Sequence, residues 1–258
     1  MSKALEDLRA RLADLDADLA FVSLAARLRP RLGDVVNWNA QVDVLGLARE
    51  FMNAKAVRVE GLFGPLLVRL LAALERYARG LVEEAVNAHS HRARTYEELE
   101  AHIRTRHLVL TGNLLASIES PRDYLTFPVE SLVANLATCL PGTADYRLNS
   151  IAFAAAVFGT GPAALDKALA NVGVRDWWDR IGADATLANL LGTKGSRATG
   201  LQARERLEEL SRWRNQLAHG GDEEIALTED ELRRCVQFVA TFTTALDAIT
   251  LDARRRTP

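Results

Sequence analysis

The sequence predicts an all-helical protein, and three observations carry this prediction. Apolar residues recur with a period near 3.6 along most of the 258 residues. No stretch shows the sustained alternation of β-branched and polar residues that a half-buried strand needs. The 7 prolines are spaced widely enough to leave long uninterrupted segments. We therefore expect a helical bundle.

The expected helices begin at the N-terminus. An amphipathic helix over about 5–28 is expected to end at Pro30, because proline lacks the N–H that continues a helix. A short helix is expected over 41–55. A long, strongly apolar helix follows over about 62–88, with Pro65 in its first turn, where proline is tolerated.

Capping signals mark two later helices. Thr95 and Glu98 have the spacing of a capping box, and so do Thr228 and Glu231, which open a last helix that runs to about residue 251. Shorter helices, a glycine-rich loop and a further long helix are expected between them, in the order 129–139, 148–158, 162–171, 175–181, loop 191–200, and 201–218.

One domain with a helical appendage is the simplest division of the chain. We expect an N-terminal helical extension over 1–55 and a main helical domain over 56–252, with a helical insert at about 90–200. A frayed basic tail covers 253–258.

Composition restricts the class of protein. Hydrophobic residues make up 48% and charged residues 26%, as in ordinary globular domains, and the net charge of −2 leaves nucleic-acid binding to a local patch. Cys139 and Cys235 are the two cysteines, so a cytoplasmic location is expected and a disulfide framework is not. The acidic N-terminus does not resemble a signal peptide, and the apolar runs are too short and too interrupted to span a membrane.

An arginine interrupts the apolar stripe of helix 201–218. At 100° per residue, Ala203, Leu207, Leu210 and Leu217 share one core-facing side, and Arg214 lies within it. A guanidinium is not stable unpaired against a core. We therefore expect Arg214 either to meet a carboxylate or to use its charge in a cleft.

The end of the same helix carries further polar residues. Asn215 and His219 flank the stripe, and Gly220 and Gly221 end the helix, so that His219 lies in the last turn, where the helix dipole favours imidazolium. Two small residues, Ser211 and Ala218, would let another helix approach closely.

Glu75 is a second charge on an apolar face. It shares its side of helix 62–88 with three valines, Val68, Val82 and Val86. Arg79 follows one turn later, where an ion pair with Glu75 is geometrically natural. We expect Glu75 to neutralise Arg214 from the neighbouring helix, with both charges in one buried polar site.

The segment from Arg214 to His219 reads R-N-x-x-x-H on a helix before glycine, and it resembles the signature of the HEPN superfamily. The surrounding segments LERYARGLVEE, ELSRWRNQLAHGG and LTEDELRRCVQFVATF resemble the RiboL-PSP-like HEPN branch over roughly residues 55–250. The resemblance implies a HEPN-type bundle and, as in many members, a metal-independent, homodimeric ribonuclease without a cofactor. It further implies that Arg214, Asn215 and His219 of two protomers meet in one cleft, with helix 201–218 at the dimer contact.

These residue types suit RNA cleavage. The reaction needs a 2′-hydroxyl deprotonated, a leaving 5′-oxygen protonated and a phosphorane stabilised. His219 can transfer protons, Arg214 can clamp a phosphate with two hydrogen bonds, and Asn215 can orient its neighbours. Glu75 and Arg79 would support the site. Further candidates for RNA contacts are Arg212, Arg204, Lys194, Arg197, Arg104 and Arg106.

The sequence favours an endoribonuclease that cuts single-stranded RNA to 2′,3′-cyclic phosphate ends. The resemblance implies a toxin or phage-defence effector, with a protein or nucleotidyltransferase-type antitoxin as a candidate partner. Two alternatives stay open. One is a non-catalytic HEPN module that binds RNA, nucleotide or a protein, and the other is a helical scaffold in which Arg214 and Glu75 are structural.

Three other motifs are interpreted as structural. GTGPAALD at 159–166 resembles a dinucleotide loop, but no βαβ pattern surrounds it. LGTKGS lacks the spacing of a phosphate-binding loop. The four histidines at 89, 91, 102 and 107 match no tetrahedral template, so no metal site is expected. With the neighbouring arginines they are expected to form a solvated basic rim, which comprises His89, His91, Arg92, Arg94, His102, Arg104, Arg106 and His107.

Overall fold

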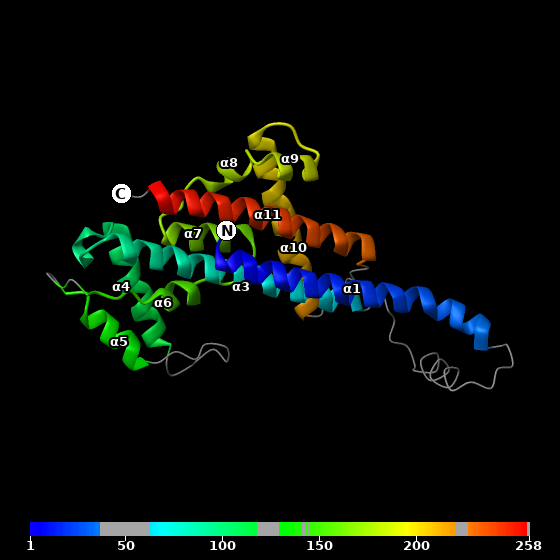
Figure 1. The fold of residues 1–258 in the computed structure, drawn as a ribbon, viewed down its shortest axis with the longest axis horizontal. Helices are drawn as coiled ribbons and strands as arrows, with labels where there is room; N and C mark the ends of the chain where they lie inside the picture. Colours follow the sequence, from blue (N-terminus) through cyan, green and yellow to red (C-terminus); the bar gives the residue numbers. More distant parts are fainter. Residues whose placement is uncertain (37–61, 118–128, 141–142, 144, 220–226, 257–258) are drawn as a thin grey trace.

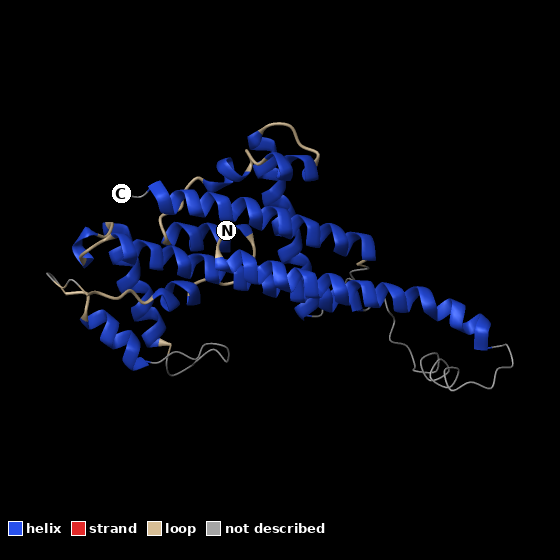
Figure 2. Ribbon diagram, in the orientation of Figure 1, coloured by secondary structure: helices blue, strands red, loops and turns tan. Residues whose placement is uncertain are grey.

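A computed structural model describes residues 1–36, 62–117, 129–140, 143, 145–219 and 227–256, with only the backbone described at 26–36, 219 and 254–256. Within these ranges every regular element is a helix and no strand occurs (Figure 2). The all-helical prediction is confirmed. The expected helix at 41–55 lies outside the described residues.

The helices follow one another in the order shown in Figure 1. Their bounds are α1 Lys3–Val36, α3 Phe63–Arg92, the 3-10 helix η2 Tyr96–Glu98, α4 Ala101–Ala116, α5 Val129–Ala137, α6 Ser150–Ala155, α7 Pro162–Asn171, α8 Trp177–Ile181, α9 Ala185–Leu191, α10 Ser196–His219 and α11 Glu229–Arg256.

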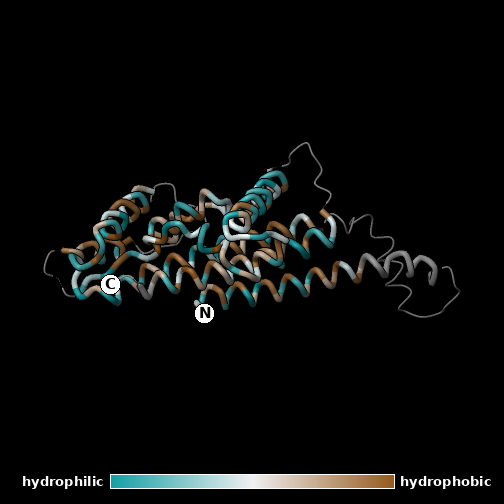
Figure 3. Tube along the Cα trace, turned by 90° about the horizontal axis from the view of Figure 1, so that it is seen from above, coloured by the Kyte–Doolittle hydropathy of each residue, from teal (hydrophilic) through white to brown (hydrophobic). Residues whose placement is uncertain are grey.

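Three long helices, α1, α3 and α11, lie side by side (Figure 1). α1 runs antiparallel to α3, because Ala4 faces Gly80 at one end of the contact and Asp18 pairs with Arg69 at the other. Hydrophobic and hydrophilic residues alternate along these helices (Figure 3), as expected where each helix buries one side. The N-terminal helix thus shares the core with the rest of the chain.

α10 reaches from α8 and α9 to the first turn of α3. Its start is fixed by two glycines. A Cβ on Gly200 would lie 2.7 Å from the carbonyl oxygen of Trp178, and a Cβ on Gly182 would lie 2.0 Å from that of Ser196. Only glycine therefore permits this close crossing. Its end packs through Leu217, whose δ-carbon would lie 3.0 Å from a Cβ on Gly64.

The lobe made by α4, α5 and α6 is organised around a buried histidine. The backbone N–H of Asn149 donates to Nε2 of His107 at 3.0 Å, so the neutral ring carries its proton on Nδ1. Nδ1 lies 3.4 Å from the hydroxyl of Tyr96 and 3.9 Å from Sγ of Cys139. Burial lowers the pKa of His107 to about 4. The expected place of His107 in a solvated rim is wrong.

Three predicted boundaries differ from the structure. α1 continues through Pro30 to Val36, because one missing hydrogen bond does not end a helix whose earlier turns are packed against α3. Thr95 does not cap a helix: only a short 3-10 turn follows, and α4 begins at Ala101 after an extended Leu99. The glycine-rich loop is shorter than expected, since α10 begins at Ser196.

The second capping box is confirmed. The backbone N–H of Glu231 donates to Oγ1 of Thr228 at 3.2 Å, and the N–H of Thr228 donates to the Glu231 carboxylate at 2.9 Å. The pKa of Glu231 is lowered, first by these hydrogen bonds from Thr228.

Candidate functional site

The core-facing side of α10 is the predicted one, but its burial decreases toward the end of the helix. Ala203, Leu207 and Leu210 are fully buried. Arg214 is half-buried and Ala218 is exposed. The last turns of α10 therefore extend past the core, which places Arg214 at the border between protein and solvent.

Arg214 has no carboxylate partner within the described residues. Its Nη1 donates to Oδ1 of Asn215 at 3.3 Å. The expected pair with Glu75 is absent, because the Glu75 carboxylate is engaged by Arg79, with Oε1 2.5 Å from Nη2. Two residues one turn apart on the same helix meet without any constraint from helix packing, and this local pair wins.

Arg79 also fixes the loop between α6 and α7. Its Nε and Nη2 each lie 3.4 Å from the carbonyl oxygen of Val157. The other end of this loop, Gly161, packs against α10, where a Cβ on Gly161 would lie 3.2 Å from Oγ of Ser211. Ser211 was expected to face another helix. It faces this loop of its own chain instead.

The opposite side of α10 is fixed by a cationic contact. The guanidinium of Arg206 lies 5.3 Å from the centroid of the Trp213 ring and hydrogen-bonds to Glu209. Its Nη2 lies 3.5 Å from Sγ of Cys235 on α11. Trp213 is thus held as a partly buried packing residue, one position before Arg214.

His219 is the last residue of α10, one turn after Asn215, and its side chain lies outside the described part of the structure. Arg212 is exposed close to the motif. Arg197 lies 17 residues before Arg214, or about 25 Å along the helix, and Lys194 precedes it. These two basic residues therefore do not belong to the same site.

The remaining RNA-contact candidates also lie away from the motif. Arg204 is held 5.9 Å above the ring of Trp178 and 3.9 Å from a carboxylate oxygen of Asp166. Arg104 and Arg106 belong to α4, where Arg106 is exposed and Arg104 half-buried. The structure brings together Arg214, Asn215 and Arg212, and it leaves the α4 pair in another lobe.

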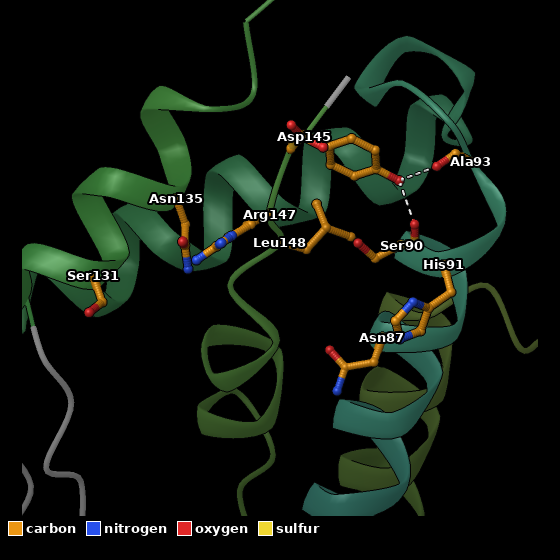
Figure 4. A pocket seen from close by; sticks show the side chains of 10 residues that line it. Asn87, Ser90, His91, Ala93, Ser131, Asn135, Asp145, Arg147 and Leu148 are labelled. Atoms are coloured by element: carbon orange, nitrogen blue, oxygen red, sulfur yellow. Dashed lines mark hydrogen bonds between the residues drawn. The ribbon is translucent and has the colours of Figure 1, made fainter. Parts of the chain in front are cut away.

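Sequence reasoning missed a polar pocket of about 600 Å³ between the end of α3, α5 and the segment before α6 (Figure 4). Tyr146 forms one wall, with its hydroxyl 3.1 Å from the carbonyl oxygens of Ser90 and Ala93. Asn87, at the pocket, follows Gly64 by 23 residues of α3, or about 35 Å. This hollow is therefore remote from Arg214.

The side chains of the described residues form no group of three or more His, Cys, Asp or Glu that could hold a metal ion. In the same part of the chain, every helix is too short or too polar to cross a membrane.

Comparison with known proteins yields one match. A sequence model of the RiboL-PSP-HEPN family matches residues 59–252, which are 194 of the 258 residues. The chain belongs to the RiboL-PSP-HEPN family. The matched part of this HEPN protein contains both the Glu75–Arg79 pair and the segment from Arg214 to His219, and α1 precedes it. No curated protein and no solved structure matches the chain.

Proposed function

We propose that this HEPN protein is a cytoplasmic, metal-independent endoribonuclease that cuts single-stranded RNA to 2′,3′-cyclic phosphate ends. The observation that carries the proposal is the half-buried guanidinium of Arg214, which lacks a carboxylate partner in the described structure and lies beside Asn215, one turn before His219. Family membership supports the same assignment. Two protomers would contribute these residues to one cleft.

Arg214 is suited to bind the reacting phosphate. A guanidinium at the edge of the core interacts with an anion more strongly than one in bulk water, because the local dielectric is lower. It can offer two parallel hydrogen bonds to the non-bridging oxygens. A carboxylate partner would compete with the phosphate, so the engagement of Glu75 by Arg79 leaves Arg214 available.

The proposed reaction is an internal transesterification. The 2′-oxygen forms a bond to phosphorus while the bond from phosphorus to the 5′-oxygen breaks. The imidazole of His219 accepts the 2′-hydroxyl proton, and an imidazolium from the partner's His219 donates a proton to the leaving 5′-oxygen. Arg214 and Asn215 stabilise the charge on the phosphorane oxygens.

The second candidate function is a non-catalytic module that binds RNA. The same unpaired Arg214 favours it, because phosphate binding needs the cation and not the proton transfer. For either function we propose a role as a toxin or phage-defence effector, with a protein or nucleotidyltransferase-type antitoxin as partner.

Cleavage of a single-stranded RNA in EDTA tests the proposal. We expect 2′,3′-cyclic phosphate ends, and no cleavage of DNA, which lacks the attacking 2′-hydroxyl. Arg214→Ala and His219→Ala should each lower the rate by about 10²–10⁴. Arg234→Ala, which removes an exposed arginine from α11, is the matched control and should retain activity.

Two results would change the assignment. Cleavage that requires added Mg²⁺, or that survives both motif substitutions, contradicts the mechanism. RNA binding without cleavage, lost in Arg214→Ala, supports the non-catalytic module.

A further inference from the structure

The loop over residues 157–161 places an exposed aromatic side chain near the motif. Phe158 is 44% exposed, although Val157 before it and Thr160 after it are buried. Phe21 on α1 is the other aromatic residue in the exposed class among the described side chains. We propose that Phe158 stacks on a base of the RNA strand beside the phosphate bound by Arg214, an inference that rests on the proposed function.

Contacts at both ends hold this loop in place. The Arg79 guanidinium lies 3.4 Å from the carbonyl oxygen of Val157, and Arg79 is itself paired with Glu75. At the other end, Gly161 packs against Ser211 on α10. Gly159 turns the chain between them with φ +78°, a backbone conformation that favours glycine. Phe158 is therefore carried by a loop of defined position.

The contact with Ser211 brings the loop to the motif. Arg214 follows Ser211 by three residues, which is about 4.5 Å along the helix and nearly one full turn around it. Phe158 precedes Gly161 by three residues, a span of about 10 Å at full extension. A nucleotide held at Arg214 thus has Phe158 among its nearest aromatic neighbours in the described structure.

This placement specifies the class of substrate. Every base has a π-face, so an aromatic platform binds single strands with little preference for sequence. A base inside a duplex is already stacked on both faces and is not available to Phe158. The site would therefore select an unpaired nucleotide next to the cleaved bond and tolerate any base there.

Substitution of Phe158 with kinetic analysis tests the proposal. Phe158→Ala should raise KM for single-stranded RNA about tenfold or more and leave kcat close to that of the wild type. Phe158→Trp should retain the wild-type KM, and Phe158→Leu, which keeps apolar bulk without a π-face, should behave as Phe158→Ala. The matched control is Phe21→Ala, which removes an exposed aromatic from α1 and should change neither parameter.

A binding measurement separates this proposal from the proposed function. An RNA with a single 2′-deoxy substitution at the cut site and 2-aminopurine beside it cannot be cleaved there, and its fluorescence should be quenched on binding through stacking. The quenching should disappear in Phe158→Ala and persist in His219→Ala. Quenching with no cleavage of ordinary RNA would overturn the proposed enzyme but support the stacking site. Equal KM and equal quenching in wild type and Phe158→Ala, or wild-type behaviour of Phe158→Leu, would overturn the stacking proposal.

Discussion

Oε1 of Glu75 lies 2.5 Å from Nη2 of Arg79, and the same guanidinium contacts the carbonyl oxygen of Val157. The two side chains are only 19% and 24% exposed. They connect α3 to the loop that packs on α10. Glu75 therefore acts on the motif through the position of this loop and not as the counter-charge of Arg214.

Loss of the Glu75 carboxylate should destabilise the protein. Glu75→Ala leaves the largely buried Arg79 guanidinium without its charged partner, which we expect to lower the free energy of unfolding by about 1–3 kcal/mol. Urea denaturation measures the change. Asp18→Ala breaks the exposed pair with Arg69 and, as a control, should cost less than about 1 kcal/mol. Similar small shifts in both variants would show that the Glu75–Arg79 pair contributes nothing to the packing of the loop.

The crossing of α8 and α10 should not tolerate a methyl group. A Cβ on Gly200 would overlap the carbonyl oxygen of Trp178, so Gly200→Ala should lower stability by about 1–3 kcal/mol through strain. The control is Gly112→Ala on the exposed side of α4, where no atom lies within 4 Å of the added Cβ. That variant should gain up to about 1 kcal/mol from helix propensity. Melting temperatures that move in the same direction for both would contradict the close crossing.

His107 should make stability depend on pH. Its pKa is about 4 in the folded protein and near 6.5 in the unfolded chain, so between these values the unfolded state binds more protons. The contribution of the neutral ring is complete above pH 6.5 and is lost as the pH falls toward 4. The loss amounts to about 3 kcal/mol over this range.

Chemical denaturation between pH 4 and 7 tests this dependence. His107→Gln keeps a hydrogen-bond acceptor for the N–H of Asn149 but does not titrate, so its stability should change less over this range. His91→Gln, at an exposed histidine, should follow the wild-type curve. A His107→Gln protein with the full wild-type slope would assign the pH dependence to other groups.

Mixed dimers test whether each cleft combines residues from two chains. If Arg214 of one protomer works with His219 of its partner, a dimer of one Arg214→Ala chain and one His219→Ala chain retains one intact cleft. We expect such a mixed dimer to recover about half of the wild-type rate, while each parent homodimer is inactive. Light scattering must show a dimer in all three preparations. An inactive mixed dimer would exclude this sharing of residues.

Local signals in the sequence were sufficient for most helices. The 3.6-residue period placed the long helices, and the capping box at Thr228 and Glu231 located the start of α11. The same spacing at Thr95 and Glu98 misled, because Glu98 accepts a hydrogen bond from the N–H of Arg94 and the chain extends at Leu99 before α4 begins. A capping box therefore predicts a helix only where the following residues keep the helical conformation.

Pairing between helices was beyond the reach of the sequence. The angular argument correctly placed Ala203, Leu207 and Leu210 on the buried side of α10, but it could not show that the core ends before Arg214. The partner of Glu75 and the loop facing Ser211 depend on how α3, α7 and α10 cross, and that geometry arises from the whole packing. Phe158 gave no signal, since a single phenylalanine after an alanine-rich helix is typical of a core residue.

The contact of Arg206 with Cys235 has a practical consequence. Cys235 is fully buried, and burial raises its pKa to about 11, so its thiol is neither ionised nor accessible in the folded protein. Cys139, in the α4–α6 lobe, is half-buried with a raised pKa. A thiol reagent can then react with Cys235 only when α10 and α11 separate transiently. The rate of labelling at Cys235 would report how often the helix that carries the motif opens, in the unmodified sequence and under the conditions of an activity assay.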